Sequence, residues 1–248
     1  MTNLTIAILA RNEEANLAEL LPTLAFVNEV IIIDDNSTNN TAKIPKKYRA
    51  KVLRHNLNSD FSQQRQFALT KSKNNWVMFM DADERLTNEL KHFLVNFNPA
   101  KNISGYSFKR IDWFYNKPIR HGEVANVMMT RLVNRKLGHF IRPVHEVWSS
   151  KYKTIAKPNL QLYHYPHPSI SEFLKHVNFY STINAQYLRK SGRNKPRMLE
   201  IMFVPLGKFI YTYFMRCGFL DGARGFIYSF MMSFHSFLTR SKLYMLYQ

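Results

Sequence analysis

Short apolar runs alternate with amphipathic segments through the first hundred residues of the chain. Four runs are rich in Val, Ile, Leu and Met, as expected of strands buried on both faces: 4–9, 29–35, 50–55 and 76–80. Between them, apolar side chains recur at helical spacing over 13–26 and 61–72. Strands alternating with helices predict an α/β fold with a mainly parallel sheet covered by helices.

The pattern changes in the second part of the chain. Residues 103–116 and 126–135 have the character of strands, and 142–148 that of a loop beside the strand ends. Residues 169–190 carry apolar side chains at helical spacing behind a serine that can cap the helix. A basic linker broken by glycine and proline follows at 189–197.

The remaining residues, 198–247, are rich in Phe, Tyr and Met. Their longest run without charge lies between Arg224 and Arg240 and has 15 residues, fewer than the roughly 18 to 20 that cross a membrane. We therefore expect an interfacial helix that lies in the headgroup layer, with its arginines facing lipid phosphates. A pair of helices packed on the core is the alternative.

Positive charge gathers in the second part of the chain. The net charge is +18; residues 1–100 hold 12 Lys and Arg against 11 Asp and Glu, whereas residues 101–248 hold 23 against 6. This asymmetry predicts an anionic partner, such as a nucleic acid, a phosphorylated glycan or an acidic membrane surface. A solvated basic face that keeps the protein soluble is the alternative.

The cysteine content and the first residues bear on the compartment. Cys217 is the single cysteine, so no disulfide forms within the chain, which fits a reducing environment. Residues 1–14 lack the basic start of a secretory signal. We expect the protein to stay in the cytoplasm.

Three carboxylates follow the fourth apolar run in the sequence DADE: Asp81, Asp83 and Glu84. Like charges at this spacing repel, and one of them would be neutralised unless a cation lay between them. The chain has neither G-x-G-x-x-G after its first strand nor a P-loop, so no such glycine loop holds phosphates. Mg²⁺ or Mn²⁺ bound to Asp81 and Asp83 would hold the phosphates instead, because these ions bridge carboxylates to diphosphate oxygens.

Three signatures in order, each at the end of an expected strand, carry a family resemblance: AILARNEEANL, IIIDDNSTNNT and MDADE. Together they resemble the family 2 inverting glycosyltransferases of the GT-A fold. The segments FSQQRQFAL, RLVNRKLGHFIRPVHE and GFLDGARGF are similar to the bacterial subfamily that adds glucose to the heptose of the lipopolysaccharide or lipooligosaccharide inner core. With them, the resemblance covers most of the chain.

The resemblance implies a division of the chain. The GT-A catalytic domain would occupy 1–168, with the nucleotide-sugar-binding half at 1–100 and the acceptor half at 101–168. A basic, aromatic, helical extension that associates with the membrane would occupy 169–248. In GFLDGARGF, two glycines that flank an Asp–Arg pair suggest tight helix–helix packing, and we expect Asp221 to pair with Arg224.

The resemblance also implies donor and metal residues. The donor-binding residues would be Ala10, Arg11, Glu13, Asp34, Asp35, Arg65 and Asp81. Asp83 would be the principal metal ligand, with Asp81 and His164 as further contacts; a packed histidine is the alternative for His164. Either Asp34 or Asp35 would bind the uracil or ribose, although a helix cap and turn would use them equally well. Arg65 could instead lie on a helix surface, and we expect Glu84 to pair with Arg85 or to cap a helix rather than to bind metal.

The chemistry needs a base as well. Displacement of a nucleoside diphosphate with inversion requires a group that accepts the proton of the acceptor hydroxyl. Glu146 is the best candidate among the few acids beyond residue 100, and the resemblance places the base in the same segment; a salt bridge with Arg142 or Arg131 is the alternative. Four basic residues suit a phosphorylated acceptor, or else form a solvated strand face: Arg131, Arg135, Lys136 and Arg142. His145 would bind the acceptor as a neighbour of the reaction centre, with a packed histidine as the alternative.

The leading hypothesis is an inverting hexosyltransferase. Its donor would be a UDP-sugar, with UDP-glucose as the favoured candidate, and its acceptor would be a lipid-linked core oligosaccharide. The enzyme would be bound peripherally to the anionic inner face of the cytoplasmic membrane. Polyprenyl phosphate, a capsule or teichoic glycan, or a protein are alternative acceptors. A nucleic-acid-binding protein would explain the charge but not DADE or Glu146, so we expect no nucleic acid partner. A sugar nucleotidyltransferase would need a glycine-rich basic loop where the chain has ARNEE.

Overall fold

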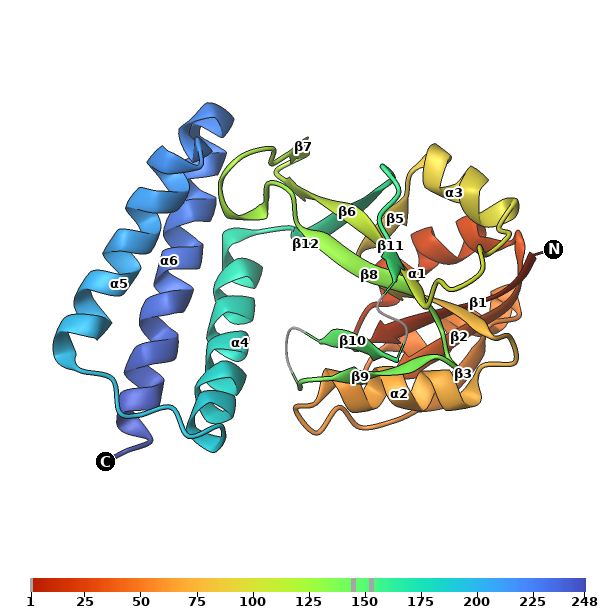
Figure 1. The fold of residues 1–248 in the computed structure, drawn as a ribbon, viewed down its shortest axis with the longest axis horizontal. Helices are drawn as coiled ribbons and strands as arrows, with labels where there is room; N and C mark the ends of the chain where they lie inside the picture. Colours follow the sequence, from red (N-terminus) through yellow and green to blue (C-terminus); the bar gives the residue numbers. More distant parts are fainter. Residues whose placement is uncertain (1, 144–145, 152–153) are drawn as a thin grey trace. The chain divides into compact units, whose positions relative to one another are not determined.

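The computed structural model describes residues 2–143, 146–151 and 154–248 (Figure 1). The chain forms two compact units. The first consists of Met1–Arg110 and Met128–His164, and the second of Ile111–Val127 and Tyr165–Gln248. The second unit therefore includes residues 111–127, which the sequence division assigned to the acceptor half.

The sheet begins with four parallel strands in the order β3-β2-β1-β4. These are β1 (Thr2–Ala10), β2 (Val27–Asp34), β3 (Lys51–Arg54) and β4 (Trp76–Asp81). Their bounds lie within about two residues of the four apolar runs. The predicted mainly parallel sheet is confirmed, because Val, Ile, Leu and Met in continuous runs bury both faces of a strand.

The sheet continues beyond β4 in the order β8-β6-β12-β5, where β8 is antiparallel to both β4 and β6 and β12 is antiparallel to β5. These strands are β5 (Glu84–Leu86), β6 (Gly105–Phe114), β8 (Met128–Asn134) and β12 (Gln161–His167), with the short strands β7 (Lys117–Pro118) and β11 (Ile155–Ala156) beside β6. A separate hairpin pairs β9 (Gly138–Ile141) with β10 (Val147–Ser150). The segment expected to be a loop, 142–148, thus ends within a strand.

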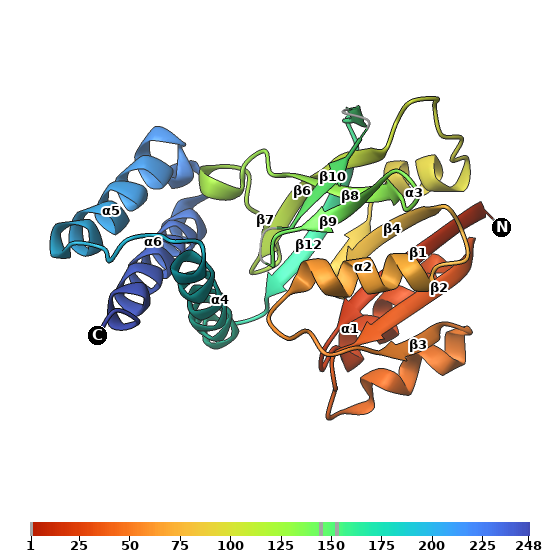
Figure 2. The same ribbon diagram turned by 60° about the horizontal axis from the view of Figure 1, so that its bottom comes forward.

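Helices cover both faces of the sheet, as the pattern predicts. On one face α1 (Glu14–Leu20) and α3 (Asn88–Val95) pack against alternate strand residues such as Ile6 and Ile8. On the other, α2 (Phe61–Lys71) and the β9–β10 hairpin pack around Ala7 and its neighbours. Figure 2 shows α2 lying across the strands.

Short 3-10 helices complete the connections of the first unit: η1 (Leu21–Leu24), η2 (Asn40–Ala42) and η3 (Ile44–Tyr48). The helix expected over 13–26 is shorter than predicted, because it gives way to η1 where Pro22 enters the chain. Proline has no amide hydrogen and its ring collides with the carbonyl four residues earlier, so an α-helix does not continue through it cheaply.

The second unit is helical. Its elements are η4 (Gly122–Val124), α4 (Ile170–Lys190), α5 (Met198–Ile210), the π-helix η5 (Tyr211–Met215), η6 (Gly218–Asp221) and α6 (Gly222–Met245). The core includes Phe114, Phe173 and Tyr228. The Ser169 hydroxyl accepts a hydrogen bond from the Glu172 backbone N–H at 3.1 Å, so the expected serine cap of α4 is present.

The longest uncharged run of the tail lies on α6, where about half of its residues, among them Gly225, Ser229 and Met231, are buried, while Phe226 and Phe230 are exposed. The apolar stretch that meets the length and hydropathy of a membrane span is instead Met198–Met215, with 18 residues, a mean hydropathy of 1.2 and 17% of the stretch buried. The longest charge-free run in the sequence therefore pointed to α6, which packs mainly inward, rather than to α5, whose apolar residues face outward.

Gly218 and Gly225, two of the three glycines of GFLDGARGF, permit a close backbone contact, as predicted. A Cβ atom on Gly225 would lie 1.9 Å from the carbonyl oxygen of Gly218. The expected pair of Asp221 with Arg224 is wrong, because Asp221 accepts hydrogen bonds from the backbone N–H groups of Arg120 and His121 at 3.1 and 2.8 Å. This carboxylate fixes the loop before η4 to the start of α6.

We predict that Gly225→Ala destabilises the protein by about 3 kcal/mol, because the methyl group collides with a backbone oxygen that cannot move independently. Gly207→Ala is the matched control. No atom lies within 4 Å of its added Cβ, so the better helix propensity of alanine should raise stability by about 0.5–1 kcal/mol. Urea unfolding of both variants checks this, and equal effects at the two positions would contradict it.

Candidate functional site

The carboxyl ends of three parallel strands meet at one edge of the sheet. Ala10 at the end of β1 is in register with Asp34 at the end of β2, and Leu9 is in register with Asp81 at the end of β4. Ligand sites of open α/β sheets lie at this edge. The three polar signatures of the sequence are thus brought together.

Two buried guanidinium groups hold Asp81. Arg65 Nη2 of α2 donates to Asp81 Oδ1 at 3.3 Å, and Arg131 Nη2 of β8 donates to Oδ2 at 2.5 Å. Burial raises the pKa of Asp81, but the two arginines outweigh it and hold that pKa well below its usual range. Asp81 is therefore an anion with both oxygens engaged.

Glu84 turns back towards the same arginine. Its Oε1 accepts a charge-assisted hydrogen bond from Arg131 Nη2, and its Oε2 accepts one from the Asp81 backbone N–H at 2.9 Å. Burial raises the pKa of Glu84 to about 7, because the nearby Arg131 offsets only part of the desolvation. The expectation that Glu84 pairs with Arg85 or caps a helix is wrong: the cap of α3 is Thr87, and Arg85 binds Glu19.

Glu146 lies directly beside this cluster. Arg65 Nε donates to Glu146 Oε1 at 2.9 Å, so one guanidinium joins Glu146 to Asp81. The Arg65 side chain is buried against the rings of Phe79 and Phe140, with 5.2 and 5.8 Å from its Cζ to the ring centroids. Arg65 is therefore no surface residue, and Glu146 pairs with it rather than with Arg131 or Arg142.

Asp83 and His164 form the second pair of the site. His164 Nε2 on β12 lies 3.4 Å from Asp83 Oδ2, and His164 is in register with Glu84 across β12 and β5. Burial raises the pKa of Asp83, but a protonated His164 and its hydrogen bond reverse this and lower it. Glu13 lies close enough for the Asp83 charge to act on it: burial, reinforced by that charge, raises the pKa of Glu13.

The remaining donor candidates line the loops after β1 and β2. Asp34 is fully buried and accepts from the Ser37 backbone N–H at 3.3 Å, as in a turn. Asp35 Oδ1 accepts from the Leu57 backbone N–H at 2.9 Å, and its Oδ2 lies 3.3 Å from Arg11 Nη1. The carbonyl oxygen of Ala10 accepts from the Asp35 backbone N–H at 3.0 Å. Both aspartates thus shape this edge, and their contacts with a nucleotide stay a prediction.

The acceptor candidates are not gathered in one place. Arg131 has a side chain only 2% exposed and two carboxylate partners, so it cannot present its charge to an acceptor. Arg135 lies next to the amino end of β4 because β8 runs antiparallel to it, and it donates to the carbonyl oxygen of Ser72 at 2.6 Å. Lys136 is exposed at this same far end. Arg142 is exposed in the connection from β9 to β10, and His145 lies outside the described residues.

The donor atoms suit a divalent cation only in part. Within the described ranges, no group of three or more His, Cys, Asp and Glu side chains is placed to hold a metal. Asp83 and His164 supply two neighbouring ligand atoms, whereas both oxygens of Asp81 already accept from arginines. Mg²⁺ and Mn²⁺ commonly take one or two protein ligands and complete their shell with water and substrate phosphates. The residues therefore fit such an ion bound together with a diphosphate.

Comparison with known protein families identifies the family to which this chain belongs. A model described as glycosyl transferase family 2 matches residues 5–176. The chain belongs to glycosyltransferase family 2. Relatives of this family 2 glycosyltransferase include the lipopolysaccharide core biosynthesis glycosyltransferase LpsC of Rhizobium meliloti, 28% identical over 97% of this chain and 92% of that protein. A glycosyltransferase of Rickettsia typhi is also 28% identical, over 98% of this chain and 87% of that protein.

Solved structures show the same fold at lower identity. The mannosyltransferase PcManGT of Pyrobaculum calidifontis, in complex with GDP-Man and Mn²⁺, has a TM-score of 0.57 at 11% identity and covers 98% of this chain and 87% of that one. Glucosyl-3-phosphoglycerate synthase of Mycobacterium tuberculosis, in complex with Mn²⁺, UDP and glucosyl-3-phosphoglycerate, has a TM-score of 0.53 at 17% identity and covers 79% and 82%. The glycosyltransferase therefore has the GT-A fold.

We predict that Arg131→Met destabilises the enzyme by about 3 kcal/mol, because it leaves Asp81 and Glu84 without their shared cation. Arg54→Met removes an exposed arginine 3.9 Å from Asp34 and should change stability by less than about 1 kcal/mol. Thermal and urea unfolding of both variants measures the difference. A loss no larger for Arg131→Met than for Arg54→Met would show that the buried network does not stabilise the fold.

Proposed function

We propose that this glycosyltransferase transfers a hexose with inversion, in the first place glucose from UDP-glucose, to the heptose of a lipopolysaccharide or lipooligosaccharide inner core. The observation that supports it most is the position of Glu146, one guanidinium away from the Asp81 carboxylate at the ligand edge of the sheet. The relative LpsC, named for lipopolysaccharide core biosynthesis, supports the acceptor class. The neighbour with bound UDP supports the donor class.

Glu146 is the proposed base. Its Oε1 accepts the hydrogen bond of Arg65, and this contact orients the carboxylate at the site. Its other oxygen, Oε2, would accept the proton of the heptose hydroxyl while that hydroxyl oxygen attacks the anomeric carbon of the donor. The new glycosidic bond forms as the bond from the anomeric carbon to the diphosphate breaks, and the configuration inverts.

Asp83 and His164 would hold a divalent cation, Mg²⁺ or Mn²⁺, which when bound stabilises negative charge on the leaving diphosphate. Because a histidine binds metal through an unprotonated nitrogen, a cation held by this pair would require His164 Nε2 without its proton. Asp81, fixed between Arg65 and Arg131, is oriented to contact the ribose or water near the cation rather than to bind it directly. Ala10, Arg11 and the aspartates after β2 would line the nucleotide pocket.

A lipid-linked acceptor also fixes the place of action. The inner core is assembled on a lipid, so the enzyme would work on the anionic inner face of the cytoplasmic membrane and attach to it peripherally. The positive balance of residues 101–248 supports an acidic partner there. No nucleic acid partner is needed to explain the charge.

We predict that Glu146→Gln lowers kcat by about a hundredfold or more while KM for the donor stays within a few-fold, because glutamine keeps a hydrogen-bond acceptor for Arg65 but cannot take a proton. Glu89→Gln, an exposed change on α3, is the control. Steady-state release of UDP in the presence of delipidated core acceptor measures both. Undiminished kcat in Glu146→Gln would remove Glu146 as the base.

We also predict that UDP-glucose with Mn²⁺ raises the melting temperature by several degrees at saturating concentration, since about 2.7 kcal/mol of stabilisation accompanies a ligand at a hundred times its Kd. GDP, CMP and TDP sugars should raise it less. Asp83→Ala should abolish the increment that Mn²⁺ adds, because it removes the principal ligand. An equal response to all nucleotide sugars would contradict the assigned donor.

A further inference from the structure

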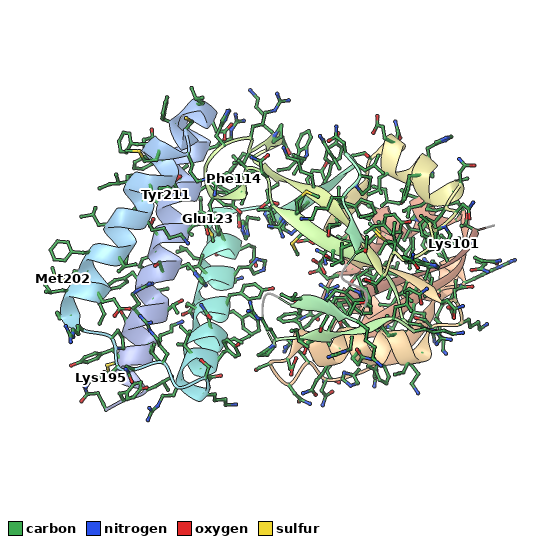
Figure 3. All side chains as sticks on the ribbon, viewed as in Figure 1. Lys101, Phe114, Glu123, Lys195, Met202 and Tyr211 are labelled. Atoms are coloured by element: carbon green, nitrogen blue, oxygen red, sulfur yellow. The ribbon has the colours of Figure 1, made fainter. Side chains whose placement is uncertain are left out.

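The outward side of α5 and η5 is an exposed apolar surface, here called the α5 face. Its members are 44–71% exposed: Met198, Leu199, Met202, Phe203, Leu206, Ile210, Tyr211, Phe214 and Met215. Figure 3 shows Met202 on the side of α5 that points away from α6. Large apolar residues concentrated at this density mark an interaction surface rather than the scattered exposure of ordinary proteins.

Folding of the helix does not require this surface. The stripe that packs inward on α5 and η5 is narrow and includes Ile201, Pro205 and Thr212, all buried. The aromatic rings continue the face onto α6, where the Phe226 ring stands edge-on to those of Phe209 and Tyr213 with centroids 5.6 Å apart. Because this helix is apolar on nearly every side, we expect its outward side to contact an apolar environment other than the protein core.

Positive charge borders the α5 face at both ends. Arg193, Lys195 and Arg197 precede α5 in an exposed loop, and Arg216 follows η5. The acids of this unit have partners within it: Glu200 pairs with Arg193 at 2.9 Å, and each of the remaining acids is also paired. These pairs are Glu123 with Lys208, Glu172 with Lys175, Asp221 with the 120–121 backbone, and Asp112 with the Tyr228 hydroxyl. The charge left at the border is cationic and suits phosphate headgroups.

We propose that the α5 face docks onto an anionic phospholipid bilayer, with α5 parallel to the surface, its apolar side chains among the upper acyl chains, and the flanking basic residues on lipid phosphates. This deepens the membrane attachment in the proposed function by naming the surface that makes it. It assigns α5, rather than the uncharged run on α6, as the element that enters the membrane.

The surroundings of Lys208 favour a helix that lies on the membrane over one that crosses it. Lys208 stands within the stretch Met198–Met215, and its ammonium pairs with Glu123 at 2.9 Å. Glu123 belongs to η4, a short helix in an otherwise irregular segment. A crossing helix would carry this ion pair and its irregular backbone into the hydrocarbon, where unsatisfied backbone groups are costly. A parallel helix leaves both on the water side.

The distribution of charge also favours lipid over a second copy of the chain. In a twofold dimer through the α5 face, the basic loop before α5 would meet either itself or Arg216 of the other copy. Either arrangement brings like charges together at the rim of the contact. A bilayer with acidic lipids offers opposite charge along the whole border.

The test is flotation of the full chain with vesicles of phosphatidylethanolamine and phosphatidylglycerol, compared with neutral phosphatidylcholine vesicles. The protein should float with the anionic vesicles and be released in part by high salt. Phe203→Glu should weaken this partitioning about tenfold or more, since a phenyl ring that would lie among the acyl chains is replaced by a charge. Val95→Glu, at the end of α3 where Val95 is 44% exposed, is the matched control and should float like the wild type.

The charged border has its own matched pair of variants. Lys195→Glu with Arg197→Glu should lower binding to anionic vesicles about tenfold or more, since each basic residue near such a surface contributes about fivefold. Lys46→Glu with Lys47→Glu makes the same change in net charge at exposed positions of η3 and should have little effect. Circular dichroism of each variant establishes that it is folded before its binding is compared.

Three results would overturn the proposal. The first is equal flotation of wild type and Phe203→Glu. The second is a dimer by light scattering that Phe203→Glu dissociates, with no vesicle binding by the wild type. The third is retention on vesicles through alkaline carbonate, which marks a crossing helix. Turnover with delipidated acceptor should be unchanged in Phe203→Glu, so loss of docking and loss of the proposed glycosyl transfer are separate outcomes.

Discussion

The site depends on a partly buried carboxylate held between two buried arginines. Asp81 ends β4 at the ligand edge of the sheet, and its oxygens accept from Arg65 of α2 and Arg131 of β8. A carboxylate desolvated there would otherwise take up a proton, and the loop that carries Asp83 would lose its anchor. The same contacts tie a helix and two neighbouring strands together, so the geometry of the site and the stability of the sheet rest on one set of charges.

The arginines also connect groups with different proposed roles. Arg65 bridges Asp81 on the donor side to Glu146, the proposed base, and its buried aromatic surroundings leave it little freedom to move. Arg131 is shared by Asp81 and Glu84, which leaves Asp83 with His164 as the neighbouring pair open to a cation. The fixed separation between Glu146 and Asp81 follows from the packing of Arg65 rather than from a bound ligand. Such preorganisation is what the proposed displacement would need.

The second unit uses charge in another way. Its acids have partners within the unit, whereas several of its arginines and lysines border an apolar helix face. The first unit binds its charges inward and the second presents them outward. The proposed function would use both arrangements, because a soluble nucleotide sugar must be enclosed, whereas a lipid-linked acceptor lies in a membrane.

The sequence by itself determined the parallel half of the sheet, the helices on its faces and the convergence of the three polar signatures. Continuous Val, Ile and Leu runs have one stable environment, a strand covered on both sides, and the ends of parallel strands meet at one edge. Only the tertiary structure decided the partners of the charged residues. Arg131 and Arg135 are equally plausible acceptor residues in sequence, yet the antiparallel course of β8 buries the first under the site and carries the second to the opposite end of the sheet. The same holds for Glu84 and for the tail. The partner of Glu84 and the choice of tail helix that faces outward both depend on which elements pack alongside, and the spacing of residues along the sequence does not determine this.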